Sequence, residues 1–103
     1  MKVLNQLFRP GAGNTKVVTV SATSTTVALV GQGANFRIVN NAGTGIYFQL
    51  GGSTISATVS DCAMLNGAVE VFRRDSETET HISIRTFTGA GTGSVYVETG
   101  EGS

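Results

Sequence analysis

The chain holds one cysteine, Cys62, directly after Asp61, and one histidine, His81, which comes 19 residues later. A thiolate with a histidine base can act as a nucleophile, but the base must lie within hydrogen-bond reach and is usually oriented by a third group. The segment around Cys62 carries no glycine elbow and no recognisable cysteine-protease motif. Because unpaired cysteine is among the most buried residue types, we expect Cys62 to be a small core-side residue and the chain not to be an enzyme.

Metal and phosphate ligands are scarce in this sequence. A structural zinc site takes four cysteine or histidine ligands, and the chain has only two such residues. Asp75, Glu77 and Glu79 alternate like oxygen ligands, but the run lacks the glycine turn and the bidentate acid of a calcium loop. A solvated hairpin tip, with Arg73 and Arg74 balancing the acids, is the favoured interpretation. The glycine-bearing loops lack a P-loop lysine and lead into no helix, so we expect no metal and no cofactor.

Charge is balanced and sparse along the chain. Seven Lys and Arg match seven Asp and Glu, which leaves no general basic field for nucleic acid and no polybasic stretch for a membrane. The apolar runs are too short to span a bilayer, and the N-terminus lacks the apolar stretch of a signal peptide. We therefore expect a soluble protein that binds neither nucleic acid nor membrane.

The low charge content itself favours a covered surface. Charged residues make up 14% of the chain, against roughly 25% in ordinary soluble domains, and a free monomer normally keeps more charge on its surface. The favoured explanation is that copies of the chain or a partner protein cover part of the surface. The alternative is a monomer kept soluble by its many Thr and Ser hydroxyls.

The first 14 residues differ from the remainder. Apolar residues recur there at helix-like spacing, and the Pro-Gly-rich residues 10–14 follow, which form a poor helix or strand interior and a good hinge. We expect an N-terminal arm and hinge at 1–14 and a single domain at 15–103. The favoured interpretation is an arm that docks on a neighbouring subunit, and the alternative is a segment folded back on its own core. The expected protein-binding residues are Val3, Leu4, Leu7, Phe8 and Arg9.

Beyond residue 14 the sequence has the period of two that is typical of strands. Gly51-Gly52 and Asn66-Gly67 indicate tight hairpins, and residues 53–59 are expected to form a strand. About eight short strands at regular spacing predict an all-β fold, an antiparallel β-sandwich with a jelly-roll-like arrangement and an N-terminal arm. An immunoglobulin-like sandwich remains the alternative, because strand order is not visible in one sequence.

Four runs of residues resemble a class of small virion proteins of tailed bacteriophages: VTVSATSTTVAL, FRIVNNAGTGIYFQLGG, MLNGAVEVF and SVYVETGEG. The match covers about residues 17–102 and consists of strand and turn patterns. The resemblance implies a capsid decoration, or cement, protein that is assembled into the virion in the host cytoplasm. Its implied partners are the major capsid protein or another virion protein, together with further copies of the chain as a homo-oligomer.

Two alternatives stay open at this point. One is a neck or tail accessory protein, or a fibre-attachment protein, of the same virion. The other is a carbohydrate-binding surface module, in which Tyr47, Gln49 and Tyr96 would share the polar face of one sheet.

Overall fold

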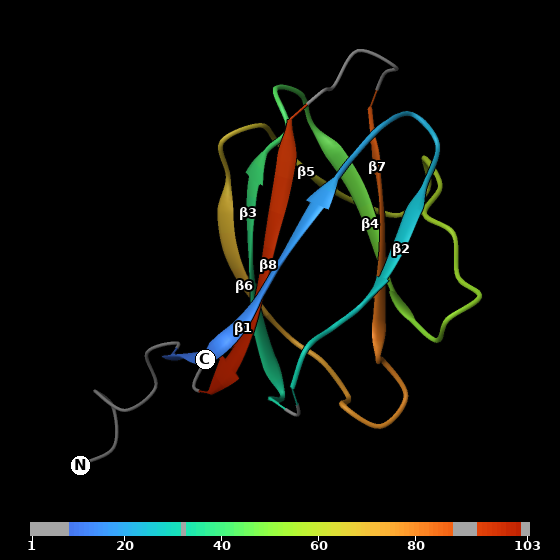
Figure 1. The fold of residues 1–103 in the computed structure, drawn as a ribbon. Coiled ribbons are helices and arrows are strands. Elements are labelled where there is room, and N and C mark those ends of the chain that lie inside the picture. The colour runs from blue at the N-terminus through green and yellow to red at the C-terminus, as the bar shows by residue number, and fades with distance from the viewer. Residues whose placement is uncertain (1–8, 32, 88–92, 102–103) are drawn as a thin grey trace.

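The computed structural model describes residues 9–31, 33–87 and 93–101 (Figure 1). Within these ranges the regular elements are all strands, as the alternating sequence predicts. They are β1 (Arg9–Thr19), β2 (Thr25–Ala28), β3 (Asn35–Asn41), β4 (Ile46–Gly51), β5 (Cys62–Met64), β6 (Val69–Arg73), β7 (His81–Thr86) and β8 (Ser94–Glu101).

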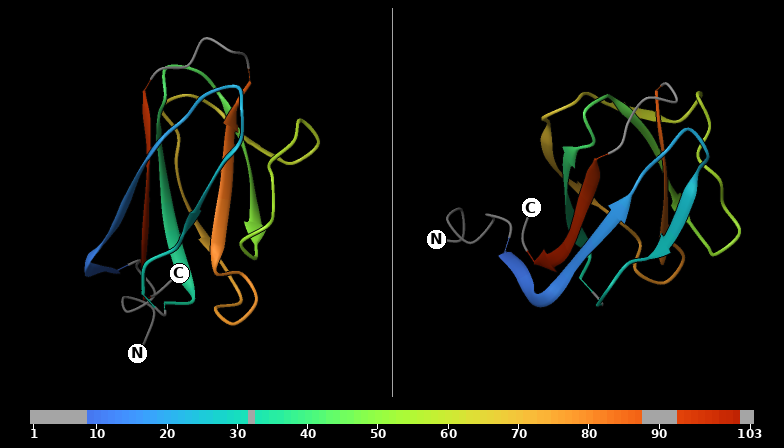
Figure 2. Two further views of the ribbon diagram at one scale, coloured as in Figure 1. Left: turned by 45° about the vertical axis from the view of Figure 1, so that its right-hand side comes forward. Right: turned by 45° about the horizontal axis from the view of Figure 1, so that its top comes forward.

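The strands form two four-stranded antiparallel sheets that lie face to face (Figure 2). Sheet A has the strand order β1-β8-β3-β6, and sheet B has the order β2-β7-β4-β5. Every connection passes from one sheet to the other except the one between β4 and β5, which are neighbours in sheet B. The predicted all-β antiparallel sandwich is therefore confirmed.

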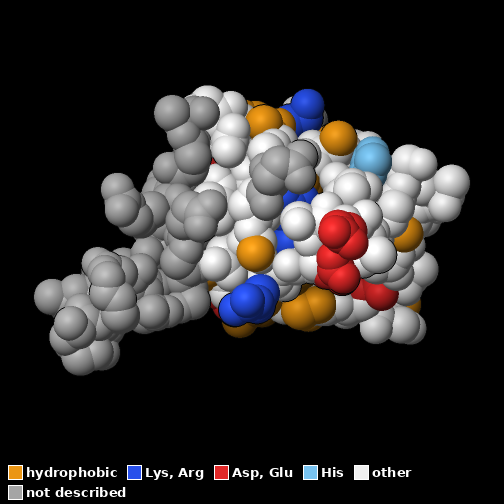
Figure 3. Space-filling model, turned by 90° about the horizontal axis from the view of Figure 1, so that it is seen from below, with side chains coloured by type: hydrophobic (Ala, Val, Ile, Leu, Met, Phe, Trp, Pro, Cys, Tyr) orange, Lys and Arg blue, Asp and Glu red, His pale blue; other side chains and the backbone are white. Residues whose placement is uncertain are grey.

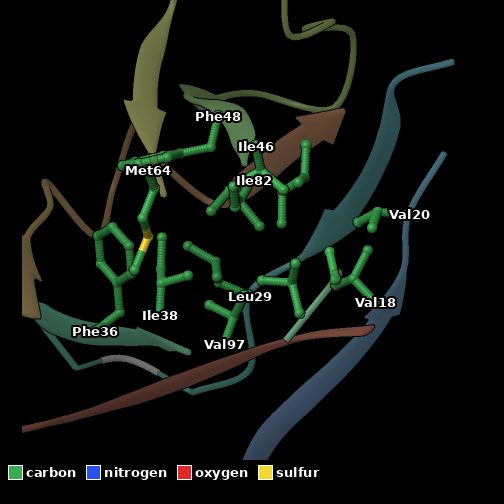
Figure 4. Packing of buried hydrophobic residues seen from close by; sticks show 13 residues of the cluster. Val18, Val20, Leu29, Phe36, Ile38, Ile46, Phe48, Met64, Ile82 and Val97 are labelled. Carbon is green, nitrogen blue, oxygen red and sulfur yellow. The ribbon is translucent and has the colours of Figure 1, made fainter. Parts of the chain in front are cut away.

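The core lies between the sheets and follows the alternation of the central strands (Figure 4). Its fully buried apolar side chains include Phe36 and Ile38 of β3, Ile46 of β4, Ile82 and Ile84 of β7, and Val95 and Val97 of β8. Phe72 of the edge strand β6 packs against two core rings, with centroids 5.6 Å from Phe36 and 5.1 Å from Phe48. Such aromatic pairs add to the stability that apolar burial provides.

Residues 53–59 are not a strand, and the expected Gly51-Gly52 hairpin is absent from this described segment. The chain between β4 and β5 instead lies over the outer face of sheet B. There the Ala57 N–H donates to Ser83 Oγ at 2.8 Å, and Thr26 Oγ1 donates to the Ile55 carbonyl at 2.8 Å. Side-chain hydroxyls thus satisfy backbone groups that a neighbouring strand would otherwise pair, which alternation of apolar and hydroxyl residues alone does not reveal.

Asn66-Gly67 does form a turn, but not a hairpin. The Ala68 N–H donates to the Leu65 carbonyl at 3.1 Å, and Gly67 has a φ of +83°. A type I′ hairpin turn needs positive φ at both central residues, and no described non-glycine residue has one. One positive φ at the third position is the pattern of a type II turn. This turn carries the chain from β5 in sheet B to β6 in sheet A.

The expected hinge at residues 10–14 is part of β1. Arg9 pairs with Glu101 and Pro10 with Gly100, and the register then shifts before Thr15 meets Glu98. Proline is tolerated here because β1 is an edge strand, and Gly13, with a φ of +73°, allows the irregularity. The predicted arm and hinge at residues 1–14 therefore overlap β1 from Arg9 onward. Residues 1–8 lie outside the described residues.

Two glycines, Gly33 and Gly52, differ in how tightly they are packed, which gives a matched test. A Cβ on Gly33 would collide with the backbone of Gly100, whereas a Cβ on Gly52 would meet nothing within 4 Å. We expect Gly33→Ala to lower the free energy of unfolding by about 1–3 kcal/mol. Gly52→Ala should leave it unchanged or raise it by less than about 1 kcal/mol. Urea unfolding of both variants measures the difference, and equal stabilities would contradict the packing at Gly33.

Candidate functional site

Cys62 and His81 do not form a nucleophile-base pair. Cys62 lies opposite Phe48 on one side of β4, and His81 lies opposite Gly51 on the other side. One intervening strand and three residue positions separate them by about 14 Å, from ordinary sheet spacings. The expectation that Cys62 is a core-side residue is wrong, since its side chain is exposed. The reason is that β5 is a three-residue edge strand, so its first residue is covered on one side only.

The acidic loop between β6 and β7 uses its carboxylates on its own backbone. Asp75 Oδ1 accepts from the Glu77 N–H at 2.9 Å, and Glu79 Oε1 accepts from the Asp75 N–H at 2.7 Å. Across the described ranges, no three His, Cys, Asp or Glu side chains gather as metal ligands would. The described surface also has no pocket. The loop is best explained as a connection between β6 and β7 whose carboxylates accept hydrogen bonds from its own backbone N–H groups.

Arg74 is not a solvated partner of the acidic loop, contrary to the sequence-based expectation. Its side chain is only 5% exposed. The guanidinium donates to the carbonyls of Gly33 (2.7 Å), Gly31 (2.9 Å) and Glu79 (3.2 Å). Burial lowers the pKa of Arg74, and the Glu79 carboxylate opposes that shift. Alternation explains the difference from Arg73, because Phe72 and Arg74 both follow the inner face of the chain while Arg73 faces solvent.

The expected sugar-binding surface of Tyr47, Gln49 and Tyr96 is not formed. Tyr47 and Gln49 lie on β4 in sheet B, whereas Tyr96 lies on β8 in sheet A, so their outer faces point in opposite directions. Tyr47 packs on Phe87, with ring centroids 4.6 Å apart. The Gln49 amide donates to the carboxylate of Asp61 at 3.0 and 3.2 Å. Tyr47 and Gln49 therefore make contacts within the chain, and the Gln49 bond joins sheet B to the loop that precedes β5.

Among the residues that the structure describes, basic side chains do not gather into one field. Seen from below, the molecule carries separate basic and acidic groups, with neutral surface between them (Figure 3). Arg37 forms an ion pair with Glu98, its partner on the neighbouring strand, with Nε donating to Oε1 at 2.6 Å. The described part of the chain contains no apolar helix of membrane-spanning length.

The outer face of sheet A carries a row of apolar side chains that crosses all four strands. Val17 lies opposite Tyr96, Tyr96 opposite Val39, and Val39 opposite Val69. We call these four residues the apolar row. Val71 adjoins it on β6 and lies opposite Arg37. The exposed fractions are 54% for Val17, 56% for Val69 and 39% for Val71.

The two outer faces of the sandwich therefore differ. Sheet B is covered by its own chain, where Ala57 is buried against Ser83. Sheet A presents the apolar row to solvent. Contiguous exposed apolar surface of this kind marks interaction sites, so the outer face of sheet A is the candidate functional site. Sequence alone missed it, because the row exists only through the register of four strands that are distant in sequence.

The expected contact residues of the arm are placed only in part. Val3, Leu4, Leu7 and Phe8 lie outside the described residues. Arg9 begins β1 opposite Glu101, at the end of sheet A where β8 finishes. The protein-binding role of these five residues stays a prediction.

The three hydrogen bonds from the Arg74 guanidinium to loop carbonyls, which we call the Arg74 clamp, give one stability prediction. Arg74→Met should lower the free energy of unfolding by about 3 kcal/mol or more, because it leaves buried carbonyls without donors. Arg74→Lys should recover only part of that loss, since one ammonium cannot span three carbonyls as a planar fork does. Arg73→Met at the exposed neighbouring position is the control and should be within about 0.5 kcal/mol of the parent. Equal unfolding midpoints in urea for the two Met variants would refute the clamp.

Asp61 gives a pH prediction. Its carboxylate accepts from the Thr58 N–H at 2.7 Å and from Gln49, and these bonds hold the pKa of Asp61 below its ordinary value of 3.8. A lowered folded pKa means that the contribution to stability is complete above that ordinary value and is lost as pH falls through the lower folded value. Asp61→Asn removes the titration, so its urea midpoint should fall less than that of the parent between pH 4.5 and pH 2. Parallel pH profiles would contradict the assignment.

Comparison of the chain with protein-family models, with curated proteins and with solved structures finds no match.

Proposed function

We propose that this chain is a structural protein of a tailed-bacteriophage virion, a capsid decoration protein that binds and stabilises the assembled head shell. The observation that carries the proposal is the open apolar row on sheet A. A protein with few charges and an uncovered apolar sheet face gains stability when another protein surface covers that face. The residue runs that resemble phage virion proteins point to the virion as the setting, where the covering surface belongs to the shell or to a neighbouring copy of the chain.

The strand order of the two sheets supports the same proposal. Strands β1 and β8, and β3 and β6, are neighbours in sheet A, whereas β2 and β7, and β4 and β5, are neighbours in sheet B. The first half of the chain thus folds antiparallel to the second half, and the resulting double ribbon is shared between two sheets. We infer that this is a jelly roll, the eight-stranded double-sheet fold found in viral capsid and lectin domains. A fold alone does not define a function, so the open face remains the stronger argument.

The physical mechanism of such a protein is binding linkage. A protein that binds the assembled shell and not its free subunits stabilises the shell by mass action. One flat sheet face provides a modest contact, but many copies on one particle act together because linked contacts raise the effective concentration of each. The apolar row suits this role, since its end residues Val17 and Val69 are already exposed on the outer face of sheet A.

We expect the N-terminal arm to dock on a neighbouring subunit of the particle. Removal of residues 2–8 leaves β1 intact, because β1 begins at Arg9. We therefore expect this deletion to abolish binding to heads that lack the protein while leaving the thermal unfolding of the domain unchanged. Co-sedimentation of purified protein with such heads measures binding, and the number of copies bound per particle measures its placement.

The matched control for this experiment is Val59→Glu, at a site that is 60% exposed in the loop over sheet B. This variant should bind heads as the parent does. Undiminished binding of the deletion variant would refute the role of the arm. A copy number that matches the few subunits of a neck or tail, rather than the many subunits of the shell, would favour the accessory-protein alternative.

A further inference from the structure

We infer that the outer face of sheet A binds residues 1–8 of a second copy of this chain, so that each copy gives one N-terminal segment and receives one. This inference concerns contacts between copies and goes beyond shell binding. It stands or falls independently of the identity of the shell partner.

The receiving surface is apolar and as wide as the sheet. The apolar row spans three inter-strand gaps, about 14 Å at ordinary spacing, and Val71 extends it along β6. Three of its four members are valines, and Tyr96 adds an aromatic ring near the middle. The ion pair between Arg37 and Glu98 borders the row, and its opposite charges offset each other. An apolar segment could therefore lie on the row without burying an uncompensated charge.

The N-terminal segment MKVLNQLF has the matching chemistry. After Met1, its apolar residues Val3, Leu4, Leu7 and Phe8 stand at i, i+1, i+4 and i+5, a spacing that would place them on one face of a helical turn. Lys2, Asn5 and Gln6 occupy the other positions. A segment with one apolar face and one polar face is suited to cover an apolar row and present its polar side to water.

The position of Arg9 argues against docking of this segment on its own sheet. Arg9 is paired antiparallel to Glu101, near the end of β8, whereas Tyr96 lies five residues back along β8, about 16 Å away. To reach its own apolar row, the segment would first have to reverse, which takes about four residues. The four residues left would extend about 13 Å at most. The segment also lacks the Gly and Pro residues that favour tight turns.

The area that is available also favours segment exchange over direct packing of two sheet faces. Four strands with three outward positions each present a face of about 400 Å² from standard spacings. Two such faces packed together would bury about 800 Å² in total, which is the size of a crystal contact. If each copy gives one segment and receives one, the buried area rises to about 1,600 Å² per pair, the size of a standard specific interface.

The first test measures the mass of the purified protein in solution by analytical ultracentrifugation. We expect an assembly of at least two 10.6 kDa chains. Deletion of residues 2–8 and, separately, Val69→Glu on the row should each give a monomer. Val59→Glu makes the same chemical change at a similarly exposed site over sheet B and should leave the assembly intact. Far-UV circular dichroism and thermal unfolding check that all variants remain folded.

The second test decides between one copy and two. In a Cys62→Ser background, a copy with Leu7→Cys is mixed with a longer, tagged copy that carries Val39→Cys, and the mixture is mildly oxidised. A disulfide needs Cα atoms within about 7 Å, so we expect a covalent product that contains one copy of each kind. A Val59→Cys copy in place of the Val39→Cys copy should give no such product above background.

Three results would overturn the inference: a monomeric parent protein, an assembly that survives both surface changes, or a Leu7→Cys and Val39→Cys mixture that forms no more mixed disulfide than the Val59→Cys control. A monomer that still decorates heads would refute the exchange and leave the proposed function standing. An assembly that depends on both surfaces but binds no head would support the exchange and refute the proposed function.

Discussion

Burial of alternate side chains between two sheets is the constraint on which the whole molecule depends. The central strands β3, β8, β4 and β7 each send every second residue inward. Most of these inward residues are apolar and almost fully buried, and Asn40, Thr86 and Thr99 are buried polar residues near the strand ends. A sheet with one buried face has only one acceptable register, because a slip of one residue would expose its apolar side chains. The register of the inner face therefore also determines which residues meet on the outer face. The apolar row on sheet A is a consequence of this coupling.

The two sheets use different means to satisfy their outer faces. Sheet B holds its connecting loop through Ser83 and Thr26 hydroxyls, and Asp61 fixes the end of that loop through Thr58 and Gln49. The sheet and the loop thus form one layer whose polar groups are paired within the chain. On the outer face of sheet A, Thr15 and Arg37 donate to the Glu98 carboxylate, and Val17, Val69 and Val71 remain exposed on the same face. That asymmetry gives the protein a single distinctive face.

The edge strands of both sheets are less suited to binding a partner than the outer face of sheet A. In sheet A, the edge strand β1 contains Pro10 and a register shift, and the edge strand β6 carries Glu70 opposite the buried Ile38. In sheet B, the edge strands β2 and β5 have only four and three residues. Short strands, proline, irregular register and inward-facing charge all discourage the addition of another strand. Association through the face is more consistent with these edges than β-strand addition.

The sequence by itself determined the class of the fold and most of its core. Period-two alternation identified the inner residues of β3, β4 and β7, such as Phe36 and Ile38, because a strand must segregate its two faces whatever its neighbours are. Other features depended on contacts between distant segments. Cys62 is exposed because its strand is an edge, Arg74 is buried because three carbonyls from two loops converge on it, and residues 53–59 bind hydroxyls instead of a strand. The apolar row likewise needed the tertiary structure, since pairing among β1, β8, β3 and β6 brings together residues as far apart as Val17 and Tyr96.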